Sequence, residues 1–140
     1  MVKHARELMT PDPACCTPNT TLDQVAKMSA WHVSAAKAAL ARLPEGRRSA
    51  ELLRHGSVEV RWYAPKGSDP QGPHDRDEIY IVASGEGTFV RGAERVRFSA
   101  NDMLFVPAKM EHRFEDFSAD FATWVVFWGP AGGEKDNPFV

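Results

Sequence analysis

Beyond Gly46, apolar residues fall in short runs with turn residues between them. The runs are rich in Val, Ile, Phe, Tyr and Trp, and several alternate with polar residues, which is typical of strands. This pattern predicts eight strands, over residues 51–54, 58–63, 78–84, 88–91, 95–98, 103–106, 112–116 and 121–128. Eight short strands at this spacing favour an all-β barrel or sandwich. The connectors 84–87, 91–93 and 99–102 are turn-sized, so consecutive strands are expected to pair antiparallel.

The part of the chain before Gly46 has a different pattern. Prolines interrupt residues 1–20, so we expect an irregular head there. Apolar positions then recur at helical spacing and predict a helical segment over residues 21–44, with a capping box at Thr21 and Gln24. Alternatively the segment breaks near Ser34, which would cap a second, separate helix.

Composition adds limits on function. The chain has 140 residues, 43% of them hydrophobic, which suits one compact domain. Seventeen basic side chains against nineteen acidic ones give a net charge of −2, so no attraction to nucleic acid or to an anionic membrane is expected. No apolar run approaches the roughly 20 residues of a membrane helix, and no secretory segment opens the chain. We therefore expect a cytoplasmic protein with a flexible tail over residues 131–140.

The candidate chemistry lies around the longest predicted loop, residues 64–73, which leads into a strand. If extended geometry begins at His74, the period of two places His74 and Glu78 on one face. His112, which opens a later strand, can supply a third ligand. Two imidazoles and a carboxylate leave about three positions of an octahedral ion open, which suits iron, manganese, nickel, cobalt or zinc. The alternative is a hydrogen-bonded trio of pocket residues without an ion.

Other side chains share faces with these candidate ligands. Arg76 and Tyr80 follow the same period as His74, and Phe114 shares a face with His112, so all three are expected to line the pocket. Arg76 could hold an anionic substrate, or it could be a solvated charge, and the aromatic rings could equally fill the core. Gln71 is expected to hydrogen-bond near the ligands rather than to bind the ion, because amide oxygens are poor ligands for such metals.

The loop and strand resemble the first sequence motif of the cupin family, which are small β-barrels. That motif reads Gly, a spacer, His-x-His, three or four residues, Glu, six residues and Gly. His74, Glu78 and Gly85 match its second His, its Glu and its closing Gly. Gly72 stands in the place of the first His, so the resemblance implies three ligands where the family has four, unless Gln71 or water substitutes.

The second cupin motif is also similar to part of this chain. It reads Gly, five residues, Pro-x-Gly, two residues, His, three residues and Asn, and Pro107 and His112 match it in register. The first Gly, the second Gly and the closing Asn are replaced by Asn101, Lys109 and Asp116. At Lys109 a positive φ is either lost or kept under strain. The likeness covers about residues 50–130 and implies a cupin-type antiparallel β-barrel, or jelly roll, after an N-terminal helical segment.

The resemblance also implies a function. It suggests one divalent metal ion held by His74, Glu78 and His112, and chemistry on a small organic molecule, either dioxygenase-like or of the Lewis-acid isomerase or lyase kind. The alternative is a small-molecule binding or sensing protein without a metal. A homodimer is implied too, with Trp124 or Trp128 covered in its interface.

Residues 1–27 have a separate likeness, to the opening of a cystathionine-β-synthase-type (CBS) nucleotide-binding module. Such a module needs further strands and a second helix, which do not follow here. We therefore expect this segment to be a truncated remnant or the product of an overlong gene start.

Overall fold

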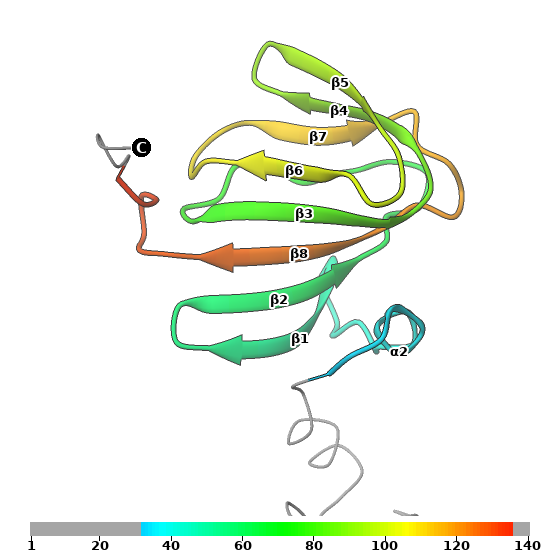
Figure 1. The fold of residues 1–140 in the computed structure, drawn as a ribbon, viewed down its shortest axis with the longest axis horizontal. Coiled ribbons are helices and arrows are strands. Elements are labelled where there is room, and N and C mark those ends of the chain that lie inside the picture. The colour runs from blue at the N-terminus through cyan, green and yellow to red at the C-terminus, as the bar shows by residue number, and fades with distance from the viewer. Residues whose placement is uncertain (1–31, 136–140) are drawn as a thin grey trace, which may run out of the picture. The chain divides into compact units, whose positions relative to one another are not determined.

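Eight antiparallel strands and one short helix make up residues 32–135, the part of the chain that this computed structural model describes (Figure 1). In chain order they are α2 (Ala35–Ala39), β1 (Ser49–His55), β2 (Val58–Tyr63), β3 (Asp77–Ser84), β4 (Gly87–Arg91), β5 (Glu94–Phe98), β6 (Met103–Val106), β7 (His112–Glu115) and β8 (Ala122–Trp128). All eight predicted strands are present, with ends within two residues of the prediction. The all-β prediction is therefore confirmed.

Contacts divide the chain into Met1–Ser34 and Ala35–Val140, and all the helices and strands named above lie in the second unit. The predicted irregular head, the first part of the predicted helical segment and the CBS-like stretch lie outside the described residues, as do residues 136–140. No helix within residues 32–135 has the length and apolar character needed to cross a membrane.

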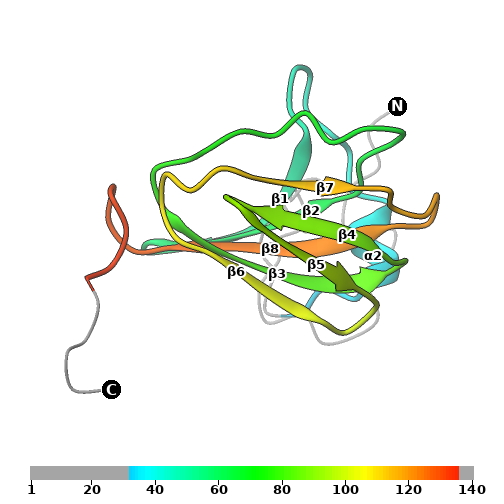
Figure 2. The ribbon, with the colours of Figure 1, turned by 90° about the horizontal axis from the view of Figure 1, so that it is seen from above.

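The strands form two sheets. One has five strands in the order β1-β2-β8-β3-β6, and the other has three in the order β5-β4-β7. Figure 2 shows the smaller sheet from above, with β4 and β5 drawn across β8 and β3 of the larger one. Both sheets contribute to a single apolar core, made of Tyr63, Tyr80, Val82, Phe89, Phe98, Val106, Phe114, Phe121 and Val125. This two-layer arrangement is the jelly roll that the cupin likeness implies.

The predicted pairing of consecutive strands is only partly correct. β4 and β5 do pair across the turn at Gly92, but β3 and β4 lie in different sheets, and so do β5 and β6. At Gly85 the chain turns from one sheet to the other with φ of +82°, and a Cβ there would lie 2.6 Å from the Cα of Phe121. A turn-sized connector can therefore join two sheets as well as two paired strands, and its length does not distinguish them.

The helix is shorter than the predicted segment. Among the described residues it covers only Ala35–Ala39 and follows Ser34, as in the alternative with a separate second helix. The prediction that it continues to residue 44 is wrong. Leu40 and Leu43 are exposed, so their apolar side chains gain nothing from helical packing, and the last turn closes with the bond from the Leu40 amide to the Lys37 carbonyl.

Within residues 32–135, three residues other than glycine have a positive φ: Asn101 at 75°, Lys109 at 69° and Asp116 at 48°. They occupy the places where the second cupin motif has Gly, Gly and Asn. Asn and Asp adopt this conformation readily, whereas a lysine Cβ is strained in it. The Lys109 amide donates a 2.6 Å hydrogen bond to the His74 carbonyl, so the turn is kept despite the substitution.

Replacing Lys109 by glycine should stabilise the protein. The Lys109→Gly variant removes the strained Cβ and keeps the amide, and we expect its free energy of unfolding to rise by roughly 1 kcal/mol, after the added freedom of the unfolded chain is offset. Chemical denaturation measures the change. The matched control is Lys109→Ala, which removes the charge but keeps the Cβ and should show no gain. A gain in both variants, or in neither, would contradict strain at this position.

Candidate metal centre

Three side chains from distant parts of the chain meet between the two sheets. His74 lies in the loop before β3, Glu78 lies on β3, and His112 is the first residue of β7. The Nε2 atoms of His74 and His112 lie 2.6 Å and 3.2 Å from the same carboxylate oxygen, Oε2 of Glu78. One ligand atom from each of the three residues lies within 4.8 Å of the others. The sequence placed these residues in one candidate site, and the fold brings them together.

Burial gives this cluster an open side. Glu78 and His112 are buried, because Glu78 points to the inner face of β3 and His112 faces it from the other sheet. The His74 side chain is 23% exposed. Its ring packs edge-on against the rings of His112 and Phe127, with both centroids 4.9 Å away. His74 is therefore the most exposed member of the cluster, and Glu78 borders the cavity that His74 also lines.

Backbone carbonyls fix the orientation of both imidazole rings. Nδ1 of His74 donates to the Arg76 carbonyl, and Nδ1 of His112 donates to the Met110 carbonyl, each at 2.8 Å. A carbonyl oxygen can only accept, so in each ring the Nδ1 carries a hydrogen, and the neutral ring presents a lone pair at Nε2. Metal-binding histidines are commonly oriented in this way. The donor set therefore fits a metal ion.

The electrostatics of the cluster call for a positive charge at its centre. Two Nε2 lone pairs and a carboxylate oxygen repel one another unless a proton or a cation lies between them. Burial opposes protonation of His74, but the hydrogen bond and the negative charge of Glu78 outweigh it, and the pKa of His74 is raised. Burial also disfavours the Glu78 anion, but the hydrogen bonds from His112 and His74 outweigh it and lower the pKa of Glu78. The carboxylate is therefore ionised, and a metal ion could replace the proton.

A hydrogen-bonded chain supports the cluster on the His112 side. The Tyr80 hydroxyl donates to Oε1 of Gln71 at 2.8 Å and lies 3.0 Å from Nε2 of His112. The Gln71 amide in turn donates to Oδ2 of Asp69 at 2.7 Å. Burial raises the pKa of Tyr80 well above its usual range, so the hydroxyl keeps its proton. Gln71 thus reaches the cluster through Tyr80 rather than directly.

Asp69 organises the loop, and the sequence analysis missed it. Its carboxylate accepts hydrogen bonds from the Tyr63 hydroxyl, from the Gln71 backbone amide at 3.2 Å and from the Phe114 amide at 2.7 Å. These bonds tie the loop before β3 to β2 and to β7. An aspartate before a proline in a loop is usually read as a turn residue, so its spacing alone could not show this role.

Asp77, the first residue of β3, was also missed. It is buried, and its carboxylate accepts from the Ala108 amide at 2.9 Å and from the Glu134 amide at 2.6 Å. The first bond fixes the loop that leads to His112. The second holds the described part of the predicted flexible tail, residues 131–135, where Gly132 also donates to the Asp75 carbonyl at 2.6 Å.

Not all predicted pocket residues line the same cavity. Tyr80 and Gln71 line a cavity of about 180 Å³ that borders His74 and Glu78. Phe114 lies in the apolar core, with its ring centroid 5.0 Å from that of Tyr80, and is not among the residues that line this cavity.

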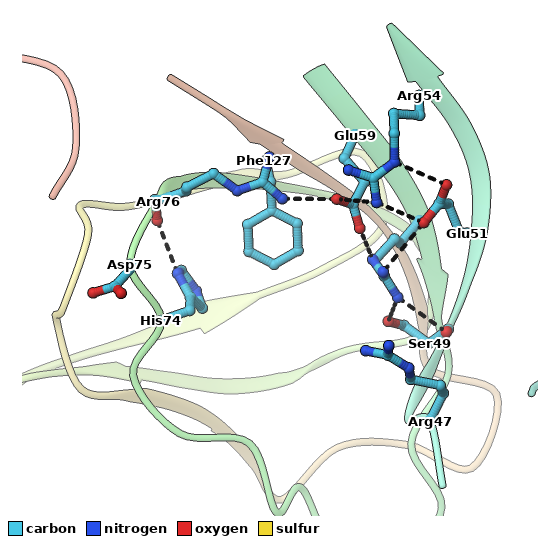
Figure 3. A pocket seen from close by; sticks show the side chains of 10 residues that line it. Arg47, Ser49, Glu51, Arg54, Glu59, His74, Asp75, Arg76 and Phe127 are labelled. Carbon is cyan, nitrogen blue, oxygen red and sulfur yellow. Dashed lines mark hydrogen bonds and ion pairs between the residues drawn. The ribbon is translucent and has the colours of Figure 1, made fainter. Parts of the chain in front are cut away.

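Arg76 lines a different, outer pocket (Figure 3). Its guanidinium lies 2.7 Å from the Glu59 carboxylate and 5.3 Å from the centroid of the Phe127 ring. Glu59 is buried on the inner face of β2, where the sequence gave no sign of a buried charge. Arg76 is therefore held by an ion pair in a second chamber beside the candidate metal centre.

Comparison with known proteins agrees with this architecture. An uncharacterised protein of Streptomyces coelicolor is 34% identical over 82 residues, which are 57% of this chain and 78% of that protein. A cupin 2 conserved barrel domain protein of Salinispora arenicola superimposes with a TM-score of 0.54 at 24% identity, over 70% of this chain and 88% of that one. A protein of unknown function from Rhizobium leguminosarum gives a TM-score of 0.58 at 19% identity, over 71% and 96%. These structural likenesses show a shared fold.

The sequence profile of the cupin domain matches residues 59–128, from β2 to the end of β8. The matched stretch contains all three members of the cluster, together with the positive-φ residues Asn101, Lys109 and Asp116. With two antiparallel sheets, an inward-facing His/Glu cluster and half of its length matched by that profile, the chain belongs to the cupin family.

Proposed function

We propose that this cupin holds one divalent metal ion through His74, Glu78 and His112 and acts on a small organic molecule in the adjoining cavity. The observation that carries the proposal is the pair of imidazoles whose Nδ1 atoms donate to backbone carbonyls while both Nε2 atoms face one carboxylate oxygen. Iron, manganese, nickel, cobalt and zinc all accept this donor set.

A bound ion would supply a Lewis acid or a site for dioxygen, because three protein ligands leave coordination positions open. The chain's own residues would do the rest. Glu78 stays ionised and offsets the charge of the ion. The partly exposed His74 marks the side on which a ligand enters, and the Tyr80 hydroxyl offers a hydrogen bond inside the cavity of about 180 Å³. Such a volume suits a small metabolite or one end of a longer one.

A small-molecule binding protein without a metal is the second candidate function. It is favoured by the raised pKa of His74, because a proton shared by His74 and Glu78 also satisfies the cluster. No buried side-chain nitrogen or oxygen among the described residues lacks a hydrogen-bond partner. The two candidates therefore differ in which positive charge occupies the centre.

Metal analysis separates the two. Chelator-washed, untagged protein, reconstituted in turn with iron(II), manganese, nickel and zinc, should take up one ion per chain. The His112→Ala variant should bind that ion at least about 100-fold more weakly, since even residues that only orient a ligand contribute up to about that much. His55→Ala is the control, because His55 is exposed at the end of β1. No stoichiometric uptake, or equal uptake by both variants, would refute the metal site.

The family's missing fourth ligand can be tested in the same assay. Gly72 lines the inner cavity with His74, its φ is not among the positive ones, and a Cβ there meets no atom within 4 Å. A Gly72→His variant should therefore place a third imidazole at the cluster and tighten metal binding by roughly tenfold or more. Gly72→Ala, which adds the Cβ without a donor, should bind like the wild type. Equal affinities for all three proteins would contradict a vacant ligand position at residue 72.

We also propose a homodimer that covers the apolar outer surface along β6. Met103 and Phe105 on β6 and Ile81 on the adjacent β3 point outward and are exposed. The Trp128 ring lies 6.1 Å from that of Phe105 and extends this surface onto β8. Large exposed apolar surfaces usually mark contacts with another molecule, and a second copy can bury the same surface symmetrically. One edge carbonyl, that of Phe105, already accepts from Arg91, so side chains rather than strand pairing would carry the contact.

Sedimentation at micromolar concentration tests this dimer. Met103→Lys puts a charge into the proposed interface and should shift the protein to the monomer, because an unpaired charge is costly to bury. Leu43→Lys is the control: Leu43 is also an exposed apolar residue, but it lies in the segment between α2 and β1, and β1 is at the opposite edge of the larger sheet from β6. The proposal fails if the wild type sediments as a monomer or if both variants remain dimeric.

A further inference from the structure

A second pocket, of about 500 Å³, lies beside the candidate metal centre (Figure 3). It shares three lining residues, Ser49, His74 and Phe127, with the inner cavity of about 180 Å³. The two spaces are therefore neighbouring chambers with a common wall. The metal centre belongs to the inner one, and nothing in the proposed metal chemistry explains the composition of the outer one.

The outer chamber is lined by a network of ion pairs between arginines and glutamates. Glu59, 3% exposed, accepts from Arg61 through Oε1 and from Arg76 through Oε2 at 2.7 Å, and the same Oε2 lies 2.8 Å from Arg54. Glu51 pairs with Arg54 at 2.8 Å and with Arg61 at 3.4 Å. Burial raises the pKa of Glu59, but the hydrogen bonds from Arg76 and Arg61 outweigh it and lower that pKa. Two carboxylates thus hold three guanidinium groups in fixed positions.

A fourth guanidinium has no such partner. Within residues 32–135, Arg47 makes no ion pair with a carboxylate, and Figure 3 shows its side chain extending into the pocket from the segment before β1. The Asp75 carboxylate also borders the pocket, but it lies on the opposite side and points away from the arginines. The next residue, Arg48, lines the inner cavity and donates to the Pro70 carbonyl. Positive charge is therefore left uncompensated at the junction of the two chambers.

The strand register shows why one ligand can span both chambers. Across the inner face of the larger sheet, Glu59, Phe127 and Glu78 are direct neighbours on β2, β8 and β3. Glu59 forms ion pairs with the arginines, and Glu78 contacts the two histidines. Phe127 lies between the two glutamates in the register, and its ring centroid is 5.3 Å from the Arg76 guanidinium carbon and 4.9 Å from the centroid of the His74 ring. A polar group at each end and an apolar surface in the middle suit an organic acid with a short carbon chain.

We infer that the outer chamber binds an oxyanion, a carboxylate or a phosphate, at one end of a small molecule whose other end reaches the metal centre. The second half of this inference rests on the proposed function; the first does not. Guanidinium groups match the oxygens of carboxylates and phosphates with paired N–H donors. Arginines already fixed by Glu51 and Glu59 lose little freedom when such a ligand binds. Arg47 supplies the charge that these ion pairs do not satisfy.

Calorimetric titration of the full chain tests the oxyanion site. The probes are succinate and inorganic phosphate, with the uncharged succinamide as reference, at about 0.15 M ionic strength to screen unspecific attraction. The wild type should bind at least one of the two anions and not succinamide, and their relative affinities show which oxyanion is preferred. Arg47→Gln should weaken that binding at least tenfold. Arg97→Gln makes the same charge change on an exposed β5 residue outside the pocket, and should change the affinity less than twofold.

The two proposals can fail separately. Arg47 is exposed and outside the ion-pair network, so Arg47→Gln should keep the melting temperature of the wild type. His112→Ala should lose metal uptake while keeping its affinity for the anion, because His112 does not line the outer chamber. If neither anion binds the wild type, or if Arg47→Gln and Arg97→Gln bind it equally well, the oxyanion site is refuted even where metal uptake succeeds. If anion binding follows Arg47 but no metal is taken up, only the metal centre is refuted.

Discussion

The contact on which this site depends is the meeting of two imidazole nitrogens with one oxygen of the buried Glu78 carboxylate. Burying a carboxylate is costly unless positive charge compensates it. Both imidazole rings are prevented from turning away by the bonds of their Nδ1 atoms to backbone carbonyls. The compensating charge must therefore enter between the three side chains, as a proton or as a cation. Much of the surrounding structure holds the loop that contains His74 and the loop that precedes His112 in the positions that this contact requires.

Hydrogen bonds donated by backbone amides hold the two histidines in place. The Lys109 amide donates to the His74 carbonyl in the loop before β3, and the Ala108 amide donates to the Asp77 carboxylate at the start of β3. The loop before His112 is therefore attached at two points. The turn at Lys109 keeps its left-handed conformation although the residue type is unfavourable there. The turn is thus left-handed although lysine stands where the motif has glycine, which indicates that the loop contacts outweigh the local strain.

The sequence predicted what depends on local pattern and missed what depends on contacts between distant segments. Glu78, Tyr80 and Val82 alternate with outward residues, so β3 and its buried face followed from the period of two. The ligand cluster followed from motif spacing. The change of sheet after β3 could not be predicted, because a short connector fits a hairpin and a crossing alike. Nor could the burial of Glu59, since besides its strand neighbour Arg61 it depends on Arg54 and Arg76, which only the fold brings to this carboxylate.

Glu59 and Glu78 together show how one sheet can carry two chemically different sites. Both glutamates point inward from the same row of the larger sheet, with Phe127 between them. Permanently charged arginines neutralise Glu59, so this ion-pair network does not depend on a group that gains or loses a proton near neutral pH. Imidazoles surround Glu78, and they can carry a proton, release it or bind a metal ion. Phe127 separates the two carboxylates. The arginines around Glu59 can therefore orient an anionic molecule without displacing the proton or metal ion beside Glu78.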